Sequence, residues 1–193
     1  MDSVWRRQLL AGILLALAVA QPVAASNFGS AGTPGTQGTI SGVWLTPDST
    51  WRIAGRNLTV NYRTGLNHTV SDSYAPTNLL VFLAVDAPSC SSAANGDDLC
   101  VYDDDYGDNG VNGWNACAGT TNGLDPHQTC DWQWVRVNLF FDPPPKRVMC
   151  HEIGHSVGLR HTAEQASCMK RTAEGGNSDV LSVHDKGHIN QHY

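Results

Sequence analysis

The stretch from residue 151 to residue 161, His-Glu-Ile-Gly-His-Ser-Val-Gly-Leu-Arg-His, constrains this chain more than any other part of the sequence. His151 and His155 are four residues apart, so on an α-helix both imidazoles project from one face and can hold a single metal ion. A ligand six residues beyond His155 reaches that ion only if the chain turns sharply, and Gly158 accepts the left-handed conformation that such a turn requires. His161 then completes a site of three histidines with one open coordination position, which is typical of a catalytic zinc ion.

Glu152 follows the first of these histidines directly and lies on the neighbouring edge of the same helix face. From there its carboxylate can accept a proton from a water molecule bound to the zinc ion. A structural zinc site needs no such base and is usually closed by four protein ligands. The alternative, an ordinary helix that matches by accident, requires all the fixed positions of the pattern to coincide by chance. The pattern therefore predicts a hydrolytic zinc site with Glu152 as its general base.

The first 25 residues are predicted to be an export signal. Arg6 and Arg7 form a positive start, residues 9–20 are an apolar run, and small residues precede Ser26. The run is too short to span a bilayer as a helix. No side of it is more polar than the other, which disfavours the alternative of an amphipathic first helix. The general export route is preferred over a twin-arginine signal, so we expect a secreted, extracellular protein.

Length and charge limit the classes of function. Without the first 25 residues the chain keeps 168 of its 193, which suits one compact domain. The whole chain has 18 acidic and 12 basic residues; one acid and two bases lie in the first 25, so 17 and 10 remain, a net charge of about −7. No cluster of Lys and Arg is long enough to grip phosphates. We therefore expect no nucleic-acid partner and no membrane span.

All six cysteines follow the predicted signal, and none shows the spacing of a zinc ribbon. An even number of cysteines in an exported chain predicts three disulfides, for which 15 connectivities exist. Cys150 precedes the first predicted ligand and Cys168 follows the third, so a bridge between them would tie the metal-binding helix to the turn beneath the metal. We therefore favour pairing of neighbours: Cys90–Cys100, Cys117–Cys130 and Cys150–Cys168.

Several acidic residues gather in one region, where glycines permit tight loops. Two interpretations are open, a solvated acidic loop and a Ca²⁺ site. No twelve-residue loop ending in Glu follows, so the solvated loop is preferred. The residues concerned are Asp97, Asp98, Asp103, Asp104, Asp105 and Asp108.

The segment after the signal is poor in apolar residues. Residues 26–42 are mostly polar or Gly, so residues 26–45 are predicted to be a flexible leader and residues 46–193 the folded domain. Residues 51–63 alternate in character, which favours a half-buried strand. Residues 76–87 contain an apolar run for which helix and strand are both open, and the proline at its start favours a helix.

The second half of the domain carries clearer signals. Residues 99–102 are a strand candidate, and residues 132–141, rich in aromatic and β-branched side chains, favour a strand most strongly. Prolines then introduce the metal-binding helix, which is predicted over residues 144–159. A last helix is predicted over residues 182–191, because it begins with a capping-box-like pair.

With these residues in place, the chain resembles a metzincin zinc endopeptidase, and within that clan the matrixin-like branch. Met169, eight residues after His161, stands at the spacing of the matrixin Met-turn methionine. The resemblance implies a mixed α/β (α+β) zincin domain with a mostly parallel twisted sheet, an active-site helix, a Met-turn and a C-terminal helix. It is closest over residues 132–193, where the tail follows the matrixin pattern at Leu181, Ser182, Asp185, Ile189 and Tyr193.

The chain also departs from the matrixin pattern. Lys170 and Arg171 stand where matrixins often have a proline, and no cysteine precedes Cys90, so the matrixin cysteine switch cannot operate. No Tyr closely follows the methionine, which argues against the fifth ligand of astacins and serralysins. His68 and His127 are too isolated to rebuild the second, structural zinc site of many matrixins and are interpreted as surface residues.

The expected function is that of a monomeric zinc endopeptidase acting on protein or peptide substrates, with one Zn²⁺ held by His151, His155 and His161. Substrate is expected to lie extended beside an edge strand, for which residues 111–118 are the candidate. Residues 170–180 are expected to line the pocket for the residue after the cut. Two alternatives remain open: a non-catalytic zinc-containing module that binds peptides or surfaces, and hydrolysis of a non-peptide amide.

Overall fold

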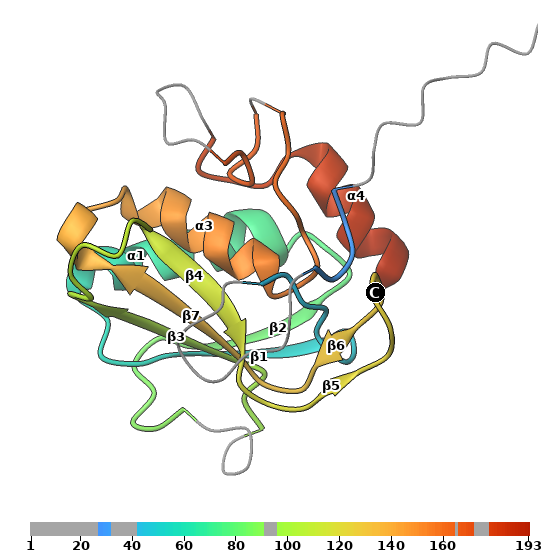
Figure 1. Ribbon diagram of the computed structural model, residues 1–193, viewed down its shortest axis with the longest axis horizontal. Coiled ribbons are helices and arrows are strands. Elements are labelled where there is room, and N and C mark those ends of the chain that lie inside the picture. The colour runs from blue at the N-terminus through green and yellow to red at the C-terminus, as the bar shows by residue number, and fades with distance from the viewer. Residues whose placement is uncertain (1–26, 32–41, 91–95, 165, 172–177) are drawn as a thin grey trace, which may run out of the picture.

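The computed structural model describes residues 27–31, 42–90, 96–164, 166–171 and 178–193 of the chain. A five-stranded sheet has the order β2-β1-β3-β7-β4 (Figure 1). Its first four strands run parallel, and β4 pairs antiparallel with β7 at one edge. The predicted mixed α/β domain with a mostly parallel sheet is therefore confirmed. The strands are β1 Thr50–Gly55, β2 Leu80–Ala84, β3 Leu99–Asp104, β4 Gly113–Cys117 and β7 Gln133–Asn138.

Two helices, α1 and α3, lie together on one face of the sheet, and α4 lies beyond the end of α3 (Figure 1). Gly65 of α1 lets the helix backbones approach closely, because a Cβ there would lie 2.9 Å from the backbone of Pro145. The other elements are a two-stranded ribbon, formed by β5 and β6, and two short irregular helices, η1 and η2. The bounds are α1 Val60–Thr69, η1 Val70–Tyr74, β5 Thr121–Asn122, β6 Thr129–Cys130, η2 Leu139–Phe141, α3 Pro145–His155 and α4 Val183–His192.

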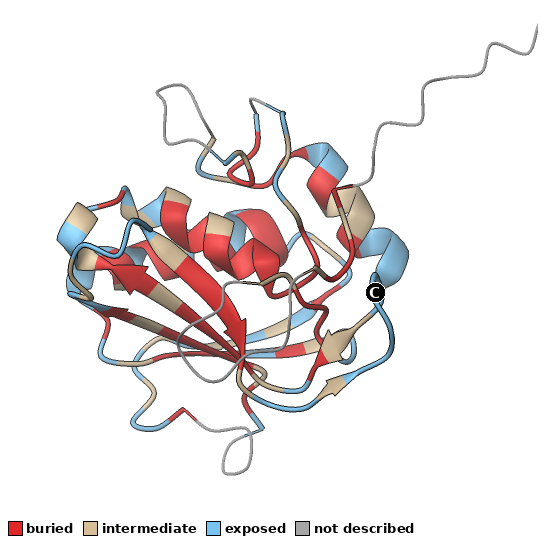
Figure 2. Ribbon diagram, in the orientation of Figure 1, coloured by how far each residue is buried: buried red, intermediate tan, exposed pale blue. Residues whose placement is uncertain are grey.

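The central strands β1, β3 and β7 carry buried side chains on both faces, as expected for parallel strands that are covered on two sides. Ile53, Val101 and Val135 belong to the main core cluster. Figure 2 shows buried residues along the central strands and along the helices that cover them. On the opposite face, Ala54 and Trp134 belong to a smaller cluster with the disulfide between Cys90 and Cys100. The main core thus fixes α3 against the sheet, and α3 carries two of the predicted ligands.

The structure contains three disulfides, and they join the neighbouring cysteines anticipated from the sequence. The bridge nearest the predicted metal site starts at Cys150 in α3 and ends at Cys168 in the loop below it. The pairs are Cys90–Cys100, Cys117–Cys130 and Cys150–Cys168.

The predicted strand over residues 51–63 is correct only as far as Gly55. Leu58 and Tyr62 are buried at 4% exposure, but Val60 between them is 73% exposed. Burial therefore recurs with the period of a helix rather than that of a strand, and α1 begins at Val60. Three apolar residues at 58, 60 and 62 are too few to distinguish the period of a strand from that of a helix, so the sequence predicted a strand here.

The helix expected over residues 76–87 is wrong, because β2 occupies this region. Its residues alternate in burial, and Leu80 pairs with Thr50 in a parallel ladder along β1. The strands and helix predicted over residues 99–102, 132–141 and 182–191 are present as β3, β7 and α4, with η2 ending the second of them. Ser182 and Asp185 form the expected capping box.

The predicted leader is not free of the domain where the structure describes it. Asn27 and Ser30 are buried, and the backbone N–H of Gly29 donates to the carbonyl of Gly158 at 2.8 Å. Farther on, Trp44 and Leu45 are fully buried. The composition predicted flexibility because it offered few apolar groups, but backbone hydrogen bonds and polar anchors hold these residues. The predicted export signal, residues 1–25, lies outside the described residues.

Candidate metal centre

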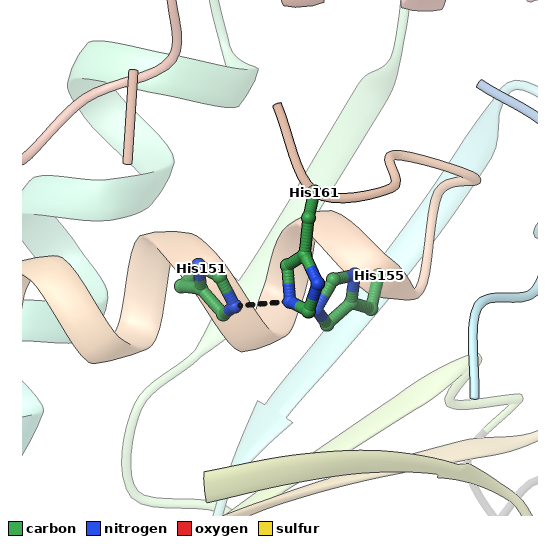
Figure 3. Close-up of side chains that lie close together, drawn as sticks. All are labelled: His151, His155 and His161. Carbon is green, nitrogen blue, oxygen red and sulfur yellow. Dashed lines mark hydrogen bonds between the residues drawn. The ribbon is translucent and has the colours of Figure 1, made fainter. Parts of the chain in front are cut away.

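The structure brings the three predicted ligand residues together. His151 and His155 project from α3, and His161 reaches them from the loop above the helix (Figure 3). The Nε2 atoms of His151 and His161 lie 3.1 Å apart. One ring nitrogen from each of the three residues lies within 4.8 Å of the others. Three imidazoles that converge in this way present their lone pairs to a single point.

Gly158 makes the turn that returns the chain to the helix. Its φ of +90° lies in the left-handed region, and a Cβ there would lie 2.5 Å from Cδ2 of Leu45. Conformation and space therefore both require glycine. The helix consequently ends at His155, four residues before the predicted end at residue 159, because a continuing helix would carry His161 away from the other two ligands.

Two of the imidazoles are held by backbone carbonyls. Nδ1 of His151 lies 2.8 Å from the carbonyl oxygen of Cys168, and Nδ1 of His155 lies 2.7 Å from that of Leu159. A carbonyl can only accept, so each Nδ1 carries the proton and each Nε2 keeps its lone pair. Burial lowers the pKa of His151 to about 4 and that of His155 well below 6.5. Neutral imidazoles are the form that binds a metal ion.

The loop carrying Cys168 is fixed from two sides. The disulfide ties it to Cys150, the residue before the first ligand, and Met169 packs fully buried beneath α3. Gly154 makes room for this packing, because a Cβ there would lie 2.3 Å from Sδ of Met169. The Gly of the His-Glu-Ile-Gly-His segment is thus explained by the methionine below it.

We expect Gly154→Ala to lower the free energy of unfolding by about 1–3 kcal/mol, the usual cost of overpacking a core. The added methyl would collide with Met169 and displace the loop that orients His151. Denaturant unfolding measures the change. Gly187→Ala in α4 is the matched control, since a Cβ there meets nothing within 4 Å and Ala favours the helix. Equal stability of the two variants would contradict the packing argument.

Glu152 lies beside the imidazoles and is 7% exposed. Burial raises the pKa of its carboxyl from 4.5 to about 8, and a divalent cation nearby would lower it again. Gly113 of β4 leaves space for this side chain, because a Cβ there would lie 2.8 Å from Cγ of Glu152. The edge strand and the carboxyl group are therefore in direct contact.

A cleft of about 1240 Å³ opens over these residues. Its floor includes the three histidines and Glu152, and the segment from Val111 to Trp114 forms part of its wall. The backbone N–H of Asn138 donates a hydrogen bond to the carbonyl of Asn112. Because peptide groups alternate in direction along an antiparallel strand, the N–H and C=O of the next residue, Gly113, face away from β7. The cleft thus has an open metal face and an edge strand beside it. Lys170 and Arg171 also line it.

Asp185 has a larger role than the helix cap that the sequence predicts. Its carboxylate, fully buried, accepts hydrogen bonds from Asn27 Nδ2 at 2.8 Å and Ser167 Oγ at 2.5 Å. The Ser167 hydroxyl in turn accepts from the N–H of Met169 at 2.9 Å. Asp185 therefore links the N-terminal segment, the loop below the metal centre and α4. In the sequence this residue was marked only by its place in the capping box and in the matrixin-like tail, and neither feature predicts its contacts with Asn27 and Ser167.

The acidic segment and the two isolated histidines form no metal site among the described residues. The acidic segment contributes Asp97 to one group of potential ligands, but its partners Cys90 and Cys100 are joined in a disulfide. The alternative interpretation as a Ca²⁺ site is therefore not supported. His68 of α1 is partly exposed and pairs with Asp72 of η1 at 3.1 Å, and His127 is exposed.

These features together define a zinc metallopeptidase. They are two histidines and a glutamate on one helix, a third histidine after a glycine turn, and a mixed α/β domain that carries them. The chain belongs to the dual-action HEIGH metallo-peptidase family, whose model matches residues 25–190. The letters HEIGH are residues 151–155 of this chain. No curated protein matches it significantly. The described helices are all too short or too polar to traverse a bilayer.

Proposed function

We propose that this metallopeptidase is a secreted endopeptidase that uses Glu152 as general base beside a zinc ion held by His151, His155 and His161. The observation that carries the proposal is the placement of a buried carboxyl and three converging imidazoles among the residues that line one open cleft. The donor set fits zinc, which accepts three histidines and keeps a position open in catalytic sites. Zinc bound there supplies Lewis acidity and lowers the pKa of water.

The chain's own groups then provide the proton transfers. Glu152 accepts a proton from the attacking water and returns it to the amine that leaves when the peptide bond breaks. Its burial keeps the carboxyl apart from bulk water, and contact with β4 fixes its position. The backbone hydrogen bonds to His151 and His155 hold both rings in one orientation through the reaction.

Substrate lies extended beside β4 in this proposal. The N–H and C=O of Gly113 face away from β7 and can pair with an extended peptide, as in other cases of strand addition at a sheet edge. The same residue contacts Glu152, so the pairing would place a backbone carbonyl next to the base.

Three finer assignments belong to the same proposal. Met169 beneath the ligands and the capped C-terminal helix support a place near the matrixin-like branch, with Met169 as the Met-turn methionine. The three disulfides and the signal-like residues 1–25 support export to the extracellular space. The folded unit then includes residues 27–31 and 42–45 as well as residues 46–193.

Incubation of the pure protein with casein, with and without a zinc chelator, tests the proposal. We expect new internal fragments, loss of cleavage on chelation, and recovery when zinc is restored. A non-catalytic module would bind peptide and leave casein intact. Hydrolysis of a non-peptide amide alone would also leave casein intact but release amine from small amide substrates, and either result would overturn the endopeptidase assignment.

A further inference from the structure

Helix α4 carries a second pair of converging histidines away from the cleft. His184 and His188 are one helical turn apart, and their Nε2 atoms lie 3.2 Å from each other. Asp185 and Ile189 occupy the buried face of the helix, so the pair stands on the outer face. Neither histidine is among the residues that line the cleft.

The separation of these nitrogens matches that of two ligands on one metal ion. Nitrogens bound at 2.0–2.1 Å with a tetrahedral angle lie about 3.3–3.4 Å apart, and about 2.9 Å apart at a right angle. The observed 3.2 Å falls between these values and is close to the 3.1 Å between His151 and His161 in the catalytic cluster. The two pairs therefore have the same nitrogen separation.

The second pair is also held in place before any ion binds. The ring of His188 stacks on Phe28, with centroids 5.5 Å apart and planes 17° apart. Phe28 in turn forms a bridge with Leu159, next to the Gly158 turn. The capping box fixes the first turn of α4, which contains His184. A ring with few alternative orientations loses little entropy when it binds a ligand.

His192 shows that helical spacing alone does not produce this geometry. It stands one turn beyond His188, just as His184 stands one turn before it. Its ring nevertheless faces Phe28 and His127, with centroid distances of 5.3 Å and 6.2 Å. Only the pair of His184 and His188 brings its nitrogens together among the described residues of this helix.

We propose that His184 and His188 form a peripheral binding site for a divalent transition metal ion, of the class of Zn²⁺, Ni²⁺ or Cu²⁺. Imidazole is a preferred ligand of these ions, and water completes the coordination. Burial and the neighbouring His184 lower the pKa of His188, which reduces competition from protons. A bound ion would join two successive turns of α4 and so stabilise the helix in this region.

The test is a titration of Ni²⁺ into the full, zinc-loaded protein, and isothermal titration calorimetry in a non-chelating buffer monitors the binding. We expect one Ni²⁺ to bind beyond the catalytic zinc, and either His184→Ala or His188→Ala to weaken that binding by at least about tenfold. Zinc content, measured in parallel, should stay constant. Ni²⁺ should raise the melting temperature of the parent protein and leave that of the double variant unchanged.

His192→Ala is the matched control, because it removes a histidine at the same spacing from His188. It should keep the affinity for Ni²⁺. The proposal is overturned if the parent protein takes up no additional Ni²⁺, in which case the pair is an ordinary hydrogen bond. It is also overturned if His192→Ala weakens binding as much as His184→Ala does. Both readouts are independent of proteolysis, so they do not depend on the endopeptidase proposal.

Discussion

Replacing Glu152 with Gln is expected to slow peptide hydrolysis by about 10²- to 10⁴-fold, the usual effect of removing a general base. Gln has nearly the same shape, so it fits the space beside Gly113. It cannot accept the proton of the attacking water. Because the carboxyl is not among the clustered ligands, the variant should fold, keep its zinc and still bind peptide. The measurements are kcat/KM on a peptide substrate, zinc content and peptide affinity.

Glu164→Gln supplies the control for this prediction. Glu164 is exposed on the loop that follows His161, so its replacement removes the same charge without touching the base. Its rate should match that of the parent protein. Similar rates for the parent and Glu152→Gln would show that another group moves the proton, even with zinc present. A loss of zinc in Glu152→Gln would instead show that the carboxyl supports the metal site.

The sequence predicted the metal-binding segment well because its geometry is local. Spacing along one helix places His151 beside His155, and a single glycine accounts for the return of the chain. The same holds for the capping box of α4, in which partners are three residues apart. In such cases the physical constraint and the residues that satisfy it lie within one short window of sequence.

Contacts between distant segments could not be predicted in this way. Whether residues 80–84 form a helix or a strand is decided by pairing with β1, which no local pattern records. The hydrogen bond between Asn27 and Asp185 joins residues 158 positions apart, and it holds one end of the short described segment 27–31 against the domain. The glycines at 113 and 154 are explained only once Glu152 and Met169 are seen against them.

Substitution of any one ligand, His151→Ala, His155→Ala or His161→Ala, is expected to remove the catalytic zinc and abolish hydrolysis. Each change leaves only two imidazoles for the ion. Changes to groups that merely support the ligands of a zinc site already lower metal affinity 10- to 100-fold, so loss of a ligand should lower it by more than about 100-fold. Metal analysis after dialysis measures the zinc that each variant retains.

The analysis should be made in a His184→Ala background, so that zinc on the outer face of α4 does not mask the loss. His68→Ala is the control, because this histidine pairs with Asp72 on α1 and lies outside the cluster. It should retain one zinc per chain and full activity. Loss should be similar for all three ligand variants, since each imidazole contributes one nitrogen to the same point. Retention of a full equivalent of zinc by all three would show that the metal binds elsewhere, and the catalytic assignment of this cluster would then be wrong.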